Sequence, residues 1–118
     1  MAHLCADYDK GMAAYNAGDY LTAYAEWHPL AAEGNLAAQY SLGLMYEYGE
    51  GLPQDYLLAF KWYRLAAEQG HASAQNNIGN MYIEGRYVPQ DYGEAFKWYQ
   101  LAIEQGYDEA QYALAIMY

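Results

Sequence analysis

The side chains that could perform catalysis or bind a metal are few, and they stand far apart. An enzyme site needs a nucleophile with a base, a paired acid and base, or a cluster of metal ligands. The residues of these types that could begin such a site are His3, Cys5, His28 and His71. No two histidines have the i, i+4 spacing of a helical metal pair, and Cys5 has no histidine at a recognised motif distance. The sequence therefore predicts no catalytic residue, no metal site and no cofactor.

Charge and composition narrow the class of partner. The chain has 118 residues, a formal net charge of −10, 55% hydrophobic residues and 18% aromatic residues. This acidity repels phosphate backbones and anionic lipid headgroups, so nucleic acid is excluded as a partner. The apolar runs are too short to span a membrane, so the sequence predicts one folded, soluble domain.

The compartment stays open at this level. The sequence shows no complete secretion signal, yet Leu4-Cys5-Ala6 just before Asp7 is what a cleaved leader with a replacement Met would leave. Two alternatives therefore remain, a cytoplasmic protein and an exported or periplasmic protein whose leader has been removed.

The dominant feature of the sequence is an internal repeat. Ala38-Gln39 recurs 36 residues later as Ala74-Gln75, and again as Ala110-Gln111. Phe60-Lys61-Trp62-Tyr63 likewise recurs as Phe96-Lys97-Trp98-Tyr99. A period of this length is typical of solenoids, in which each unit buries its apolar face against its neighbours.

Each unit has the pattern of two helices. Ala38, Leu42 and Met45 have the spacing of one buried helical stripe, and the glycines and proline of 49–53 end that helix. Asp55 is then placed to cap a second helix over 55–69, and Gly70 is placed to end it. The same pattern predicts helices over 73–84 and 91–105.

The units follow from these helices. We expect a single helical-repeat domain with a degenerate first repeat over 7–34, full repeats over 37–70 and 73–106, and a half repeat over 108–118. The exact recurrence of Trp62 and Tyr63 as Trp98 and Tyr99 favours a packing role for all four, whereas Lys61 and Lys97 are expected to be solvated.

The repeated motifs resemble a known family. The strings Ala-Gln-x-x-Leu/Ile-Gly-x-Met-Tyr, Pro-Gln-Asp-Tyr, Ala-Phe-Lys-Trp-Tyr and Glu-Gln-Gly are similar to those of the Sel-one-like repeat family, which is related to tetratricopeptide repeats. The resemblance implies an all-α fold, a right-handed α-solenoid of antiparallel helix pairs, that acts as a protein-binding adaptor or scaffold in bacterial envelope and other settings. One departure is Tyr87, which replaces the second loop glycine, Gly51, and leaves open whether the two loops share one conformation.

The resemblance also implies where a partner binds. In such superhelices the first helix of each pair lines a concave groove, and its residues between the core positions face that groove. Tyrosine offers contact area at low entropic cost, and asparagine offers both a donor and an acceptor to a peptide. The predicted partner-binding residues are Tyr8, Met12, Tyr15, Tyr40, Leu44, Glu47, Asn76, Asn80, Ile83 and Tyr112. The partner is predicted to be a protein or peptide; the alternative for any single residue is that it only packs or is solvated.

Two other functions remain as alternatives. The last helix has no second helix behind it, so Ile116, Met117 and Tyr118 could form a self-association surface that makes the chain a homodimer. Some cysteine-rich relatives bind or slowly hydrolyse β-lactams, which by resemblance alone suggests a weak hydrolase. This chain lacks their repeated cysteines, since Cys5 is its single cysteine.

Overall fold

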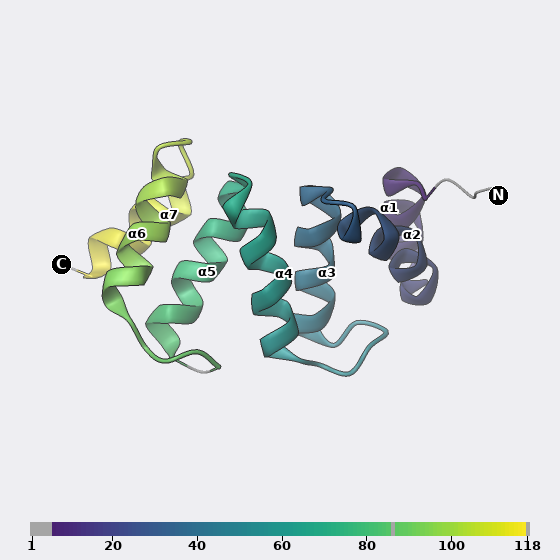
Figure 1. Ribbon diagram of the computed structural model, residues 1–118, viewed down its shortest axis with the longest axis horizontal. Helices are drawn as coiled ribbons and strands as arrows, with labels where there is room; N and C mark the ends of the chain where they lie inside the picture. The colour runs from purple at the N-terminus through teal and green to yellow at the C-terminus, as the bar shows by residue number, and fades with distance from the viewer. Residues whose placement is uncertain (1–5, 86, 118) are drawn as a thin grey trace. The chain divides into compact units, whose positions relative to one another are not determined.

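The computed structural model describes residues 6–85 and 87–117, without the side chains of 116 and 117. Within these residues the fold is all-helical, with seven helices in sequential antiparallel pairs, as the sequence predicts (Figure 1). The helices are α1 (Tyr8–Asn16), α2 (Tyr20–Ala32), α3 (Leu36–Tyr48), α4 (Tyr56–Glu68), α5 (Ala72–Glu84), α6 (Tyr92–Ile103) and α7 (Asp108–Met117). His3, Cys5 and Tyr118 lie outside the described residues.

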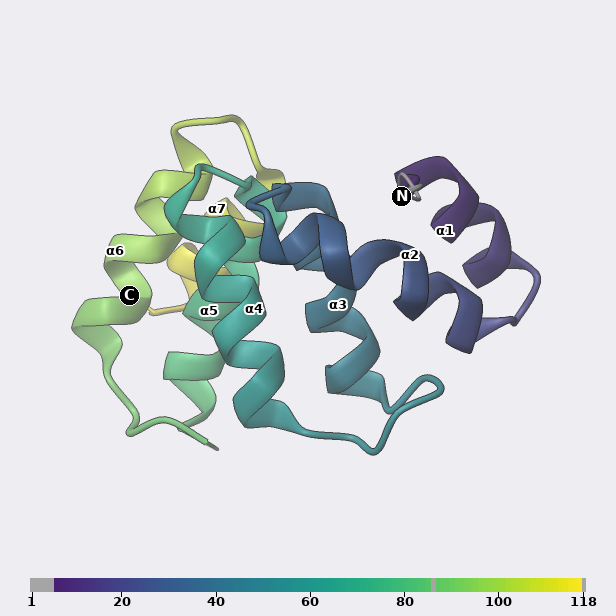
Figure 2. The ribbon, with the colours of Figure 1, turned by 45° about the vertical axis from the view of Figure 1, so that its right-hand side comes forward.

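The chain forms two compact units, residues 1–62 and 63–118, and the boundary falls within α4. In unit 1, α1 and α2 pack side by side and α2 packs on α3 (Figures 1 and 2). In unit 2, α6 packs between α5 and α7. Each unit has its own hydrophobic core.

Polar side chains begin most of the helices, as capping requires. The Asp55 carboxylate accepts from the backbone N–H of Leu58 at 3.0 Å, and the Asp91 carboxylate accepts from that of Glu94 at 3.0 Å. Both N-caps are therefore confirmed. A cap on α5 was not predicted: His71 accepts the N–H of Ala74 through Nδ1 at 3.2 Å.

In unit 1 the core is built around Trp27 of α2. This side chain is 1% exposed and packs with alanines and long aliphatic residues of α2 and α3. The α1 backbone comes so close to its ring that a Cβ at Gly11 would lie 2.7 Å from Trp27 Cδ1. Real Cβ atoms do not approach that closely, so only glycine fits at position 11. The other buried core residues are Ala23, Ala31, Ala38, Leu42 and Met45.

Unit 2 repeats this arrangement around Tyr99 of α6. Tyr99 is 2% exposed, and a Cβ at Gly79 of α5 would lie 2.7 Å from its Cδ1 atom. Gly11 and Gly79 therefore have the same packing role, because both glycines admit a ring from the second helix of the pair. The other buried core residues are Ala95, Ala102, Ala110 and Leu114.

The two long loops share one anchor. Gln54 Nε2 donates to Glu47 O at 2.6 Å, and Gln90 Nε2 donates to Ile83 O at 2.8 Å. The loops differ where the sequence left the question open. Gly51 has a φ of 74°, a left-handed conformation, whereas no non-glycine residue in the described chain, Tyr87 included, has a positive φ.

The repeated Ala-Gln pair has a structural role that the sequence analysis did not assign. Gln39 Nε2 donates to Ala31 O at 3.1 Å in unit 1, and Gln75 Nε2 donates to Ala67 O at 3.1 Å in unit 2. Both glutamines are 4% exposed. Each one gives a second hydrogen bond to a carbonyl near the end of the preceding helix, which also accepts the backbone N–H of Gly34 or Gly70 at 3.0 Å. The glutamine thereby ties the start of one helix to the end of the helix before it.

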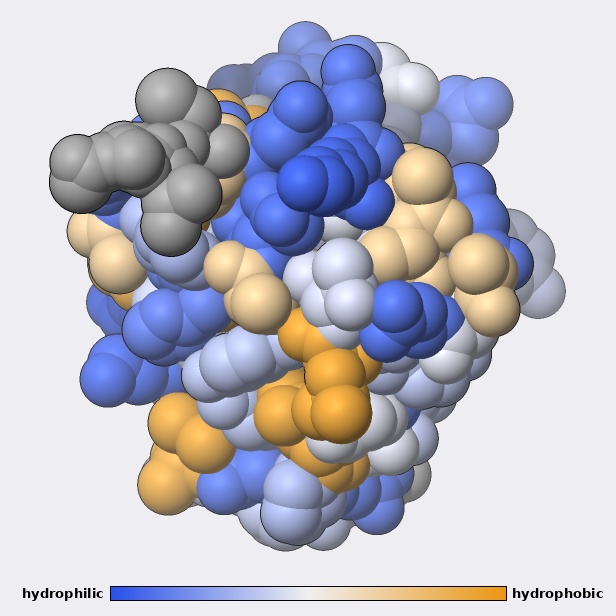
Figure 3. All heavy atoms as spheres, turned by 90° about the vertical axis from the view of Figure 1, so that its right-hand side faces the viewer, coloured by the Kyte–Doolittle hydropathy of each residue, from blue (hydrophilic) through white to orange (hydrophobic). Residues whose placement is uncertain are grey.

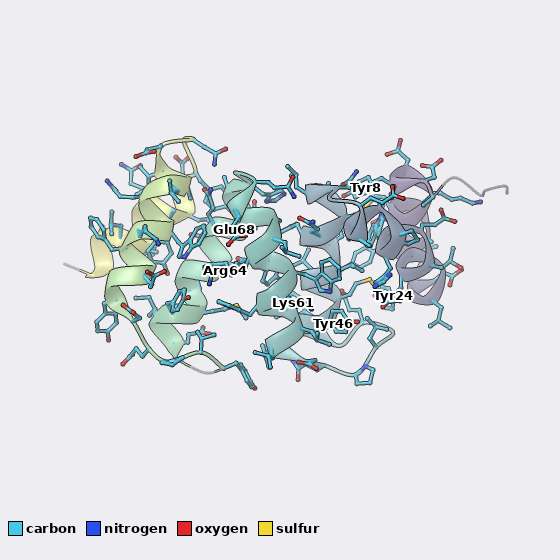
Figure 4. The ribbon with its side chains drawn as sticks, viewed as in Figure 1. Tyr8, Tyr24, Tyr46, Lys61, Arg64 and Glu68 are labelled. Carbon is cyan, nitrogen blue, oxygen red and sulfur yellow. The ribbon has the colours of Figure 1, made fainter. Side chains whose placement is uncertain are left out.

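The recurrent helix residues mostly occupy their expected places. Tyr63 and Trp98 are buried, while Trp62 is half-buried and packs against the unit 1 core. Lys61 and Lys97 are exposed, as expected. Figure 4 labels Lys61 on α4.

The surface of the described residues mixes polar and apolar groups. Figure 3, which views the molecule from the right-hand side of Figure 1, shows hydrophobic atoms in separate patches among hydrophilic ones. On α4, Arg64 Nε donates to Glu68 Oε2 at 3.0 Å, and Figure 4 labels both side chains. None of the described helices is long and apolar enough to cross a membrane.

Candidate functional site

The predicted partner-binding residues of α1 pack against the unit 1 core. The Tyr8 ring stacks on Trp27 with a centroid distance of 5.6 Å, and its hydroxyl is 3.4 Å from Ser41 Oγ on α3 (Figure 4). Met12 packs against the same cluster. For these residues the packing alternative is observed, and their role in binding stays a prediction.

Tyr15 is also held in place within unit 1. Its hydroxyl donates to the Glu50 carboxylate at 2.8 Å, and its ring lies 5.3 Å from that of Tyr20. Burial, together with this hydrogen bond, raises the pKa of Tyr15 to about 12. The phenol therefore stays neutral across the physiological range, and it acts as a donor that fixes the 49–53 loop to α1.

The predicted residues of α3 are half-buried. Tyr40, Leu44 and Glu47 all lie in this class, and Tyr40 and Glu47 have interactions of their own. Their partial exposure leaves part of each side chain available to a partner. Their binding role stays a prediction.

In unit 2 the predicted residues line a hollow. It lies between α5 and α7 and has a volume of about 480 Å³. Its lining brings together three predicted residues: Asn76 and Asn80 from α5, and Tyr112 from α7. Tyr112 is the most open of them, at 72% exposed. These three predicted residues therefore share one concave surface in unit 2.

Asn76 corrects one expectation. Its side chain was expected to be exposed on the groove, but the residue is only 3% exposed. It lines the hollow from a buried position. Among the described residues no hydrogen-bond partner is found for its Oδ1 atom. A buried acceptor without a donor is rare, and each case calls for an explanation.

The two remaining predicted residues of α5 are tied to the unit 2 core. Asn80 Oδ1 accepts a hydrogen bond from the Tyr99 hydroxyl, and Ile83 packs against the core cluster. Burial raises the pKa of Tyr99 to about 12, so the hydroxyl remains a donor. Asn80 is therefore oriented by the core and presents the rest of its surface to the hollow.

Three residues of the lining were missed by the sequence analysis. Asp108, Glu109 and Ala113 come from α7, and both carboxylates lie in its first turn. Their signal was present in the sequence: the corresponding first turn of α5 carries Ala72 and Ser73, so the acidic pair is a departure from the repeat. It was read only as the start of a helix.

The remaining candidates are not brought together. The self-association residues Ile116 and Met117 belong to the α7 backbone, but their side chains, like Tyr118, lie outside the described residues. Within residues 6–85 and 87–117, no group of three His, Cys, Asp or Glu side chains could hold a metal ion. His28 lies 5.9 Å from the ring of Trp62 and 5.2 Å from that of Tyr24, a packing role.

Comparison with solved structures gives close matches. A Sel1 repeat protein from Oxalobacter formigenes is 34% identical with a TM-score of 0.89, over 94% of this chain and 46% of that one. A protective antigen present in uropathogenic Escherichia coli strains, which displays an SLR fold, is 41% identical with a TM-score of 0.81, over 88% of this chain and 23% of that one. The chain thus spans less than half of either structure. No curated protein matches the sequence.

A family model agrees with these structures. The Sel1 repeat model matches residues 36–71, 72–107 and 108–118, which is well over half of the chain. Repeat proteins of this kind typically mediate protein interactions, and the family is generally non-catalytic. From its repeat motifs, its helix pairs and these matches, the chain belongs to the Sel1 repeat family.

Proposed function

We propose that this chain is a non-catalytic adaptor. It captures an extended peptide or a partner helix on the groove that is lined by the first helix of each repeat. The observation that supports it most is the hollow between α5 and α7, lined by Asn76, Asn80 and Tyr112. Its volume of about 480 Å³ lies within the range of small-ligand pockets. An open hollow of this kind suits one side chain of a longer partner.

The chemistry of the lining favours recognition over reaction. An exposed tyrosine ring gives contact area, and two amides can pair with a peptide backbone. No serine, threonine, cysteine, lysine or histidine, the residues that form the usual nucleophile and base pairs of hydrolases, is among the lining residues. The β-lactamase resemblance therefore finds no support in this lining.

Selection of peptides tests the adaptor function. A phage-displayed library of short unstructured peptides would be passed over the immobilised protein, and enriched sequences would be measured by fluorescence anisotropy. We expect Tyr112→Ala to weaken the enriched peptides at least about tenfold. The matched control is Tyr92→Ala on α6, because Tyr92 is 58% exposed in the same unit but does not line the hollow.

Two outcomes would overturn the proposal. One is enrichment no greater than on a surface without protein. The other is binding that both tyrosine variants weaken equally, which would mean a non-specific contact. If light scattering instead shows a dimer that excludes peptide, self-assembly through α7 replaces the adaptor function.

A further inference from the structure

The hollow between α5 and α7 is acidic. Asp108 and Glu109 are exposed at its edge, and no Lys, Arg or His is among its lining residues. The described basic side chains of unit 2 are paired elsewhere: Arg64 with Glu68 and Lys97 with Glu94. A positively charged group entering the hollow therefore meets carboxylates without competition from these cations.

Asn76 gives a second, independent indication of a ligand. The residue is only 3% exposed, and its Oδ1 has no donor among the described residues. The other buried amides, Gln39 and Gln75, both have hydrogen-bond partners. Leaving a buried acceptor without a hydrogen bond lowers the stability of the folded chain. A donor that a bound partner brings into the hollow would explain why this acceptor is present.

The available partners in the lining are thus mostly acceptors beside an exposed ring. The Asp108 and Glu109 carboxylates can only accept when ionised, and Asn76 Oδ1 also accepts. Tyr112 adds an aromatic face on which a cation can rest. Arginine fits this set better than lysine, because its planar guanidinium carries five donors and also stacks on aromatic rings.

We propose that this hollow binds an arginine side chain of an extended peptide, with the guanidinium donating to Asp108, Glu109 and Asn76 Oδ1 and lying against Tyr112. The proposal rests on the proposed function, since the arginine belongs to the captured peptide. It names the residue that the adaptor selects. The rest of the peptide contributes contacts that are not sequence-specific.

A small probe tests the arginine site without a peptide. N-acetyl-arginine amide would be titrated into ¹⁵N-labelled protein and followed by two-dimensional NMR. We expect saturable shifts in the side-chain amides of Asn76 and Asn80 and in the backbone of 108–113. N-acetyl-citrulline amide keeps the shape without the charge, and it should bind at least about tenfold more weakly. N-acetyl-lysine amide should fall between the two.

Charge-matched variants locate the effect. Asp108→Asn with Glu109→Gln should abolish the shifts, while Glu84→Gln with Glu104→Gln, exposed acids outside the lining, should leave them unchanged. Circular dichroism would confirm that both doubles stay folded. The citrulline comparison needs no variant, so it decides the question even if one double unfolds. Equal binding of citrulline and arginine, or shifts that survive the acidic double, would overturn the proposal.

The peptide library separates this proposal from the proposed function. Enriched peptides with a fixed arginine, lost in the acidic double, support both. Enriched peptides that depend on Tyr112 but carry no fixed arginine keep the adaptor and overturn the arginine site. If no peptide is enriched and no NMR shifts appear, both proposals are overturned. Binding of acetyl-arginine with no enriched peptide would overturn the adaptor and the peptide part of this proposal together.

Discussion

The same pair of helix positions is packed in unit 1 and hollow in unit 2. Aligned on Gly11 and Gly79, Tyr8 of α1 corresponds to Asn76 of α5, and Met12 corresponds to Asn80. Tyr8 and Met12 pack against the unit 1 core, whereas the two asparagines line a hollow. Side-chain size at two positions therefore decides whether the repeat fills this space or leaves it open.

The facing helices differ in charge at the same place. In unit 1 the first turn of α3 carries Leu36 and Ala37, and in unit 2 the first turn of α7 carries Asp108 and Glu109. In unit 1 the two α1 positions pack against the core, and in unit 2 the corresponding α5 positions line a hollow with two acids at its side. The proposed recognition site therefore lies in unit 2, at positions whose unit 1 counterparts pack against the core.

The largest effect should come from what the two units share. Gly79→Ala places a methyl group against the buried Tyr99 ring, and Gly11→Ala does the same at Trp27. We expect each to lower the free energy of unfolding by about 2–3 kcal/mol, measured by urea denaturation. Gly93→Ala is the control, because its nearest contact, Asp91 Oδ1, is at 3.3 Å, and it should change stability by less than about 1 kcal/mol.

The next effect should separate the two units. Tyr8→Ala removes a ring stacked on Trp27 and should cost about 1–2 kcal/mol. Asn76→Ala should change the free energy of unfolding by less than about 1 kcal/mol, because the lost packing is offset by removal of an unpaired buried carbonyl. Equal losses in urea denaturation would mean that Asn76 is an ordinary packing residue.

A pH effect should appear at one helix start. Burial lowers the pKa of His71 below its ordinary value of 6.5, and its neutral Nδ1 caps α5. The unfolded chain therefore binds a proton at His71 more readily than the folded chain does. The contribution of His71 to folding stability is present above pH 6.5 and is lost as the pH falls below it.

His71→Asn tests this, because Asn35 caps α3 at the corresponding position with no titration. We expect the variant to match the parent at neutral pH and to gain up to about 1 kcal/mol over it under acid conditions, measured by thermal unfolding across pH. Parallel pH profiles for the two proteins would contradict the cap.

The smallest stability effect should accompany a large binding effect. Tyr112→Ala alters a side chain that is 72% exposed and should change stability by less than about 0.5 kcal/mol. The affinity for the enriched peptides should fall at least about tenfold. Calorimetry could instead show a loss of stability comparable to that of Tyr8→Ala. Tyr112 would then be a packing residue like Tyr8, and the contrast between the two units would fail.

Much of the fold followed from local patterns. The caps Asp55 and Asp91 are confirmed, and the helices predicted over 55–69, 73–84 and 91–105 lie within about two residues of the observed bounds, because capping and period are read from neighbouring residues. The degenerate first repeat has the same packing contact, since the approach of Gly11 to Trp27 matches that of Gly79 to Tyr99.

The candidate site followed less completely. Asn80 and Tyr112 were predicted and do line the hollow, but Asn76 was expected to be exposed and is buried. Asp108 and Glu109 were missed, because nothing in their own sequence neighbourhood says that they face the asparagines of α5. The hollow that brings these acids and asparagines together is formed by helices about 30 residues apart in the chain.

Spacing and residue type within one period are enough to identify the repeat, the helix pairs and the Sel1 family. That Asn76 is buried without a donor, and that acids of α7 share its hollow, emerges only from how the helices pack. The physical reason is that burial depends on the size of side chains on the facing helix, and the period sets which face a residue occupies but not what covers it.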